Sequence, residues 1–85
     1  MNQKLFVLND VKSGTYTAPT VHLSRGQALR DFGDAINGNP DTLLAKHPED
    51  FTLFEIGEYD VYTGTIILHD AKEAVANGLD LKISQ

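Results

Sequence analysis

The 85-residue chain contains no cysteine, and none of its apolar runs is long. Without cysteine it can form no disulfide framework, no thiolate metal site and no catalytic thiol. The apolar runs are too short to span a membrane. Residues 1–8 carry one lysine ahead of four apolar residues, which is not the pattern of a secretion signal. We therefore expect a soluble protein of a cell interior with no membrane partner.

Positive charge is scarce as well. Seven lysine and arginine residues stand against twelve acidic residues, which gives a net charge of −5. Such a field repels nucleic acid and anionic lipid at long range, so indiscriminate binding to either is disfavoured, although a local basic face is compatible with the composition. The cations are scattered singly along the chain: Lys4, Lys12, Arg25, Arg30, Lys46, Lys72 and Lys82.

What the chain does contain is enough apolar material for one core. Hydrophobic residues make up 41% of the sequence and low-complexity tracts are absent, so we expect a single ordered domain over residues 1–85. An apolar run at 5–8 and a turn cluster at 9–14 predict the first arm of a hairpin. The returning strand begins at 15–17, is interrupted at Pro19 and continues through 20–23.

A capped helix is the next element that the pattern predicts. Ser24 followed three residues later by Gln27 fits a capping box, and Asn37-Gly38 is a typical helix end. Apolar residues recur between them at helical spacing, with charged residues on the opposite side. The residues of this apolar face are Ala28, Leu29, Phe32, Ala35 and Ile36.

A second, shorter helix and an acidic strand follow. Asn39-Pro40 can start a helix over 41–46 with Leu43 and Leu44 pointing inward, and Pro48 ends it. From Phe51 onward apolar and polar residues alternate, which predicts a strand with one buried face and one acidic, solvated face. The chain then turns at 60–64 and returns as a strand at 65–68.

The C-terminal part shows the signals of one more helix and one more strand. The run 70–73 fits a capping box led by Asp70, with a helix ending at Asn77-Gly78, and apolar residues alternate with polar ones from Leu79 to Ser84. The expected fold class is α+β: an antiparallel sheet of about four or five strands, comprising two hairpins and a C-terminal strand, with two or three helices packed on one face.

One short pattern occurs twice. The segments DVKSGT at 10–15 and DVYTGT at 60–65 match at an offset of fifty residues. The simpler interpretation is that both are the same common turn, with aspartate first and glycine at a bulge. A duplicated unit of hairpin and helix is the alternative.

The sequence offers little support for catalysis. The carboxylates of the acidic strand have no fixed paired spacing, and no calcium-loop, phosphate-loop or nucleophile-elbow motif is present. His22, His47 and His69 show no paired ligand spacing. We therefore expect no enzyme activity, no metal and no cofactor, and we interpret the acidic strand as a solvated face with turn caps.

The segments KHPEDFTLFEIGEYD at 46–60 and RGQALRDF at 25–32 carry a resemblance. They are similar to the small non-structural protein of gokushoviruses, single-stranded-DNA phages of the microvirus family. The likeness extends from residue 4 through the hairpin at 63–64, and the last fifteen residues lie outside it. It implies a DNA-binding accessory of single-stranded DNA synthesis in the cytoplasm of a bacterial host. That family has no defined catalytic residues, so none is assigned here.

Three functions stay open at this point. The first is a replication accessory that contacts single-stranded DNA, expected as a homodimer, since small sheets with exposed edges often pair. The second is an adaptor whose acidic strand binds a basic replication or host protein, and the third is a mimic of the phosphate backbone. The candidate DNA contacts are Arg25, Arg30, Lys46, Tyr59 and Tyr62. The candidate acidic surface is Glu49, Asp50, Glu55, Glu58 and Asp60.

Overall fold

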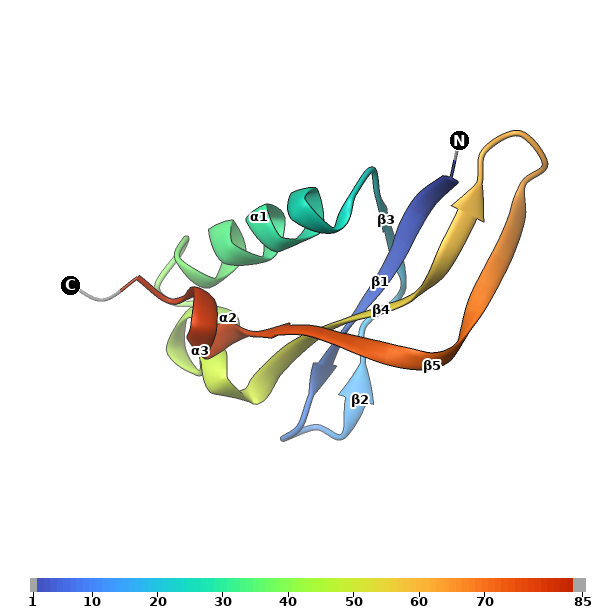
Figure 1. The fold of residues 1–85 in the computed structure, drawn as a ribbon. Helices are drawn as coiled ribbons and strands as arrows, with labels where there is room; N and C mark the ends of the chain where they lie inside the picture. The colour runs from blue at the N-terminus through green and yellow to red at the C-terminus, as the bar shows by residue number, and fades with distance from the viewer. Residues whose placement is uncertain (1, 84–85) are drawn as a thin grey trace.

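The computed structural model describes residues 2–83, which form a five-stranded antiparallel sheet with helices beside it (Figure 1). The strand order is β2-β1-β4-β5, and β3 also pairs with β1. The predicted α+β class is therefore confirmed. The strands are β1 (Asn2–Asp10), β2 (Thr15–Tyr16), β3 (Thr20–His22), β4 (Phe51–Asp60) and β5 (Thr65–Asn77). The helices are α1 (Arg25–Ile36), α2 (Leu43–Lys46), α3 (Gly78–Leu81) and the 3-10 helix η1 (Pro48–Asp50).

The two hairpins, β1–β2 and β4–β5, are closed by the same turn. In each, the aspartate carbonyl accepts the amide of the glycine four residues on, at 2.9 Å from Gly14 and 2.8 Å from Gly64. Both glycines have φ +70°, a value that favours glycine over other residues. The repeated turn is thus confirmed. The alternative of a duplicated hairpin-helix unit is wrong, because β5 continues as a strand where the first unit enters α1.

The edge strand beside β1 is broken in two. Both β2 and β3 pair with β1, and between them the Thr17 amide still donates to the Leu8 carbonyl at 2.9 Å. The ladder stops over Ala18 and Pro19, where proline offers no N–H. The predicted interruption is confirmed.

Helix α1 covers one face of β1 and β4. Its Ser24 cap accepts the Gln27 amide at 3.1 Å, as predicted, while the Gln27 side chain accepts from Leu23 instead of completing the box at Ser24. Ala35, expected inside, is exposed because it lies at the margin of the apolar stripe. The core cluster is Phe6, Ala28, Phe32, Ile36, Phe51 and Leu53.

The second helix begins later than predicted. Thr42 caps α2 by accepting the Ala45 amide, and the Asn39 side chain accepts the Asp41 amide, so residues 39–42 form a turn. Because the helix begins at Leu43, the Leu43 side chain points outward, with 65% of the residue's surface exposed, and Ala45 is buried. The expectation of an inward Leu43 is therefore wrong. Pro48 does end α2, and it starts η1.

The C-terminal assignment is reversed. The helix expected after Asp70 is the second half of β5, and the strand expected from Leu79 is α3 through Leu81; Ser84, included in that expectation, lies outside the described residues. The edge of β4 that does not face β1 carries backbone N–H and C=O groups that need partners. The second half of β5 supplies them, with Leu53 opposite Ala76. Asn77 then caps α3 by accepting the Leu79 amide. Over the described part of the chain, no helix is long and apolar enough to cross a membrane.

Candidate functional site

A carboxylate lies inside the molecule between α1 and the sheet. Alternation along β4 turns Phe51, Leu53, Glu55 and Gly57 inward, so Glu55 is only 3% exposed. The expectation that all the acidic side chains of this strand are solvated is therefore wrong for Glu55. Sequence reasoning missed this position because a lone glutamate in an alternating strand carries no sign of its face.

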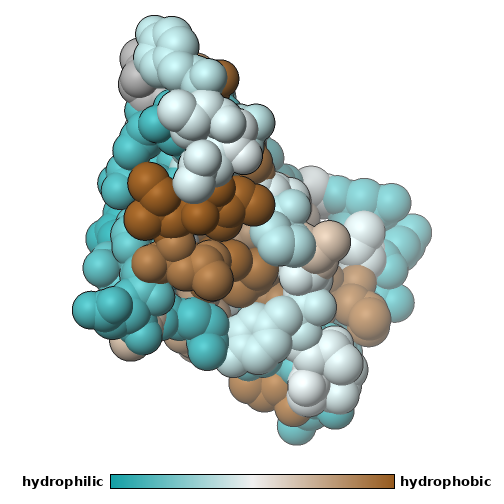
Figure 2. All heavy atoms as spheres, turned by 90° about the vertical axis from the view of Figure 1, so that its right-hand side faces the viewer, coloured by the Kyte–Doolittle hydropathy of each residue, from teal (hydrophilic) through white to brown (hydrophobic). Residues whose placement is uncertain are grey.

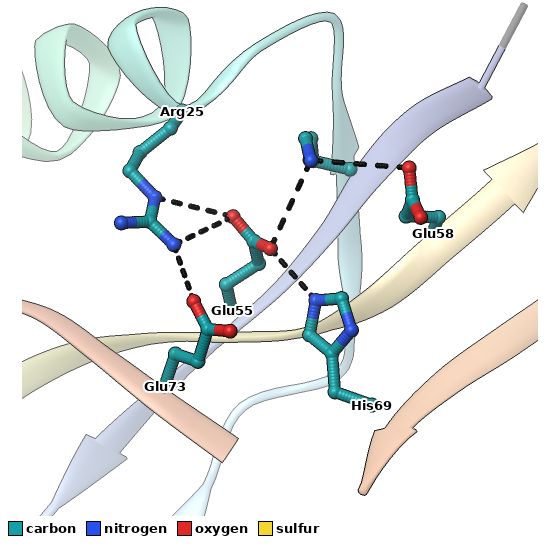
Figure 3. Close-up of polar contacts among 6 residues, drawn as sticks. Arg25, Glu55, Glu58, His69 and Glu73 are labelled. Atoms are coloured by element: carbon teal, nitrogen blue, oxygen red, sulfur yellow. Dashed lines mark hydrogen bonds and ion pairs between the residues drawn. The ribbon is translucent and has the colours of Figure 1, made fainter. Parts of the chain in front are cut away.

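Three cationic or donor groups hold the Glu55 carboxylate (Figure 3). One oxygen accepts from Arg25 Nε at 3.2 Å and Nη2 at 3.1 Å. The other lies 2.7 Å from Nε2 of His69 and 4.0 Å from Nζ of Lys4. Arg25 also donates to Glu73 at 2.6 Å. One buried carboxylate thus joins α1, β1, β4 and β5.

The electrostatics of this cluster follow from these contacts. Burial by itself raises the pKa of Glu55, but the hydrogen bonds from His69 and Arg25 and the charge of Lys4 outweigh it and leave the pKa below its ordinary value. Hydrogen bonds to Glu73 and Glu55 raise the pKa of Arg25. The cluster therefore carries fixed charges that are mutually compensated.

Among residues 2–83, two groups of side chains come close enough to share a metal ion. Glu55, His69 and Glu73 have ligand atoms within 4.8 Å of one another, but the Arg25 guanidinium already bonds both carboxylates and repels a cation there. The second group, His47, Glu49 and Asp50, lines an open pocket beside Lys12 and is largely solvated. Neither arrangement resembles a built metal centre.

The candidate DNA contacts lie on different parts of the molecule. Arg25 is paired with Glu55 and Glu73. Arg30 and Lys46 are exposed on α1 and α2, whereas Tyr59 lies on β4 and Tyr62 at the tip of the β4–β5 hairpin, at the opposite end from α2 (Figure 1). The fold does not gather the five into one groove.

The candidate acidic surface is divided in the same way. Glu49 and Asp50 precede β4, whereas Glu58 and Asp60 lie near its far end, about 30 Å of strand away. Asp60 serves the hairpin turn: its side chain accepts the Tyr62 amide at 2.9 Å, and that bond lowers the pKa of Asp60. With Glu55 buried, the five acids do not form one surface.

The feature that the sequence reasoning missed is an exposed apolar patch on the β4–β5 hairpin, which we call the hairpin patch. Its residues are between 40% and 81% exposed, with Tyr62 the most exposed of them. Figure 2 shows apolar residues gathered on the side of the molecule where this hairpin projects. A signal was present, because residues 61–68 contain no charged side chain. The members are Val61, Tyr62, Ile66, Ile67 and Leu68.

Below the hairpin patch, β5 departs from regular pairing with β4. Gly57 pairs with Leu68 and Glu55 with Glu73, so residues 69–72 bulge opposite the single residue Ile56. The bulge carries His69 inward to Glu55. Residues 65–68 are thereby left as a short regular edge, and the unpaired side of this edge faces away from β4.

A family model described as Phage ORF5 protein matches residues 3–81. No curated protein and no solved structure matches the chain.

Proposed function

Because the chain belongs to the Phage ORF5 protein family, we propose that it is a non-enzymatic phage accessory protein that acts by binding a protein partner through the hairpin patch. The observation that carries the proposal is the exposure of five apolar side chains in a segment with no charge. Contiguous exposed apolar surface of this kind is typical of protein interaction sites. Membership of the gokushoviruses, and with it a bacterial cytoplasmic setting, stays a prediction.

A protein partner suits the distribution of charge better than DNA does. Lys4 and Arg25 are paired with carboxylates within the fold. Lys82 bonds backbone carbonyls, and Lys72 lies over the Tyr16 ring at 5.4 Å. These cations are committed to internal contacts, and the net charge of −5 repels a phosphate backbone.

The proposal is tested with the other proteins of the phage, each purified and titrated against the chain by calorimetry. The variant is Tyr62→Ala, which truncates the most exposed member of the hairpin patch. The matched control is Leu43→Ala, an exposed apolar truncation on α2. We expect at least one phage protein to bind, with affinity about tenfold lower for Tyr62→Ala and unchanged for Leu43→Ala. Equal binding by both variants would refute the role of the patch.

Single-stranded DNA is the second candidate, and Tyr62 favours it too. Tyr62 is 81% exposed at a hairpin tip, where a base can stack on its ring. Lys12, Arg30 and Lys46 make no ion pair within residues 2–83 and could contact phosphates. In this case, the affinity for a labelled oligonucleotide should fall steeply with salt and with Tyr62→Ala. Absence of binding at low salt would rule out this candidate.

A further inference from the structure

We propose that the outer edge of β5 pairs with the same edge of a second copy of this chain, forming an antiparallel two-fold dimer centred on Ile67. The inference deepens the proposed function, on which it rests, by naming one partner of the hairpin patch. The edge is short and regular over residues 65–68, and among residues 2–83 no strand pairs with it.

The occupant of this edge is a β-strand, because the edge offers backbone groups for a ladder. The Ile67 carbonyl faces Gly57 of β4, so close that a Cβ on Gly57 would overlap it. Backbone groups alternate in direction along a strand. The N–H and C=O groups of Ile66 and Leu68 therefore point away from β4, toward a further strand.

This edge lacks the usual protection against pairing. Natural sheets guard exposed edges with charged residues, proline or a bulge. Residues 61–68 have no charge and no proline, and the bulge begins only at His69. Charged residues resume with Asp70 and Lys72. The unguarded stretch is therefore confined to the hairpin patch.

Two-fold symmetry selects the register. Antiparallel strands related by an axis perpendicular to the sheet place residues of the same face opposite one another, so the axis passes through a residue. An axis at Ile67 places Ile66 of each copy opposite Leu68 of the other copy. It also places Ile67 opposite Ile67 of the other copy. An axis at Leu68 would instead place Ile66 opposite Asp70. Only the register at Ile67 places all three apolar residues opposite apolar residues.

Charge permits a second copy at this edge, whereas the opposite edge of the sheet, formed by β2 and β3, is also uncharged but is interrupted at Pro19. Each copy carries a net charge of −5, so two copies can approach closely only through an uncharged segment. In the Ile67 register, Thr65 meets His69 and no carboxylate faces another carboxylate. The contact is short, which places the dimer among weak interfaces.

The experiment uses charge exchange at the symmetry axis. Ile67→Lys and Ile67→Asp each place two like charges opposite each other in the dimer. The two charges lie close together because Ile67 and its equivalent in the second copy form a non-hydrogen-bonded pair. Sedimentation equilibrium up to about 1 mM protein covers weak association. We expect the wild type to dimerise, each variant to dimerise at least tenfold more weakly, and an equimolar mixture of the two to regain dimers of mixed composition.

Leu43→Lys, which changes an exposed apolar residue on α2, is the control and should dimerise like the wild type. Circular dichroism establishes that each variant is folded. A monomeric wild type, a mixture as weak as its components, or equal weakening by Leu43→Lys would overturn the proposal.

The dimer and the proposed function can be refuted independently. A monomer that binds a phage protein through Tyr62 would refute the dimer and leave the proposed function intact. A dimer that binds no phage protein would refute the proposed function and leave the dimer intact.

Discussion

Glu55 shows how one buried charged residue can organise a small domain. Its carboxylate is compensated by Arg25, His69 and Lys4, which come from three different elements. All three partners are far from it in sequence, so their meeting depends on the pairing of β1 with β4, on the packing of α1 and on the bulge of β5. The pattern of the strand could indicate that residue 55 alternates with its neighbours, but not that it faces inward.

Removing this carboxylate should destabilise the fold. Glu55→Ala leaves Arg25 and His69 without their buried partner, and we expect a loss of about 2 kcal/mol in the free energy of unfolding. Glu58→Ala, which removes only the partly exposed ion pair with Lys4 at 3.8 Å, should cost less than about 1 kcal/mol. Urea unfolding at neutral pH measures both. Equal losses would contradict the assigned role of Glu55.

The same residue makes stability depend on pH. The folded pKa of Glu55 lies below the ordinary value of 4.5, so the folded chain binds fewer protons than the unfolded chain near that pH. Its contribution is complete above pH 4.5 and is lost as the pH falls through the folded pKa. We expect Glu55→Gln to lose less stability than the wild type between about pH 7 and pH 3, as measured by urea midpoints. An identical loss would refute this assignment.

At the scale of elements, the sequence predicted the two hairpins and α1 because their signals are local. Turn glycines, the Ser24 cap and helical spacing act within a few residues. The segment after Asp70 was wrongly predicted as a helix. It forms a strand because it pairs with the edge of β4, and no local sequence pattern indicates that this edge is available. The Asn-Gly pairs illustrate the same limit: Asn37 ends α1, whereas Asn77 begins α3.

Asn77 is the residue on which the junction of β5 and α3 depends. Its side chain donates to the carbonyls of Glu49 and Phe51 and accepts the Leu79 amide. We expect Asn77→Ala to cost about 1–2 kcal/mol in the free energy of unfolding. Asn39→Ala, which removes an exposed turn contact, should lower the free energy of unfolding by only about a few tenths of a kcal/mol. Thermal unfolding measures both changes. A reversed order would contradict this account.

At the scale of the whole molecule, the fold extends 44 × 24 × 18 Å, and the β4–β5 hairpin projects beyond α1 (Figure 1). The candidate DNA contacts and acidic residues were grouped from sequence by residue type. Their separation in space could not be foreseen, because it depends on how long β4 is and where each helix docks. The uncharged segment at 61–68 could have been recognised, but a strand of this composition is usually buried.

Salt distinguishes the two binding modes by the sign of its effect. Raising sodium chloride from about 50 to about 500 mM screens the repulsion between two acidic copies, so we expect dimerisation to strengthen or stay constant. Binding to single-stranded DNA should weaken steeply over the same range. Sedimentation and fluorescence anisotropy at matched salt concentrations measure the two. A dimer that dissociates as salt rises would contradict an uncharged interface.

The interrupted edge formed by β2 and β3 bears on how far such assembly can go. In a pair joined through β5, both outer margins of the combined sheet are this edge, where Pro19 breaks the ladder. A margin without a continuous row of N–H groups is a poor template for another strand. Growth of the proposed dimer would therefore end at two chains, and the break at Pro19 would prevent the dimer from polymerising into fibres.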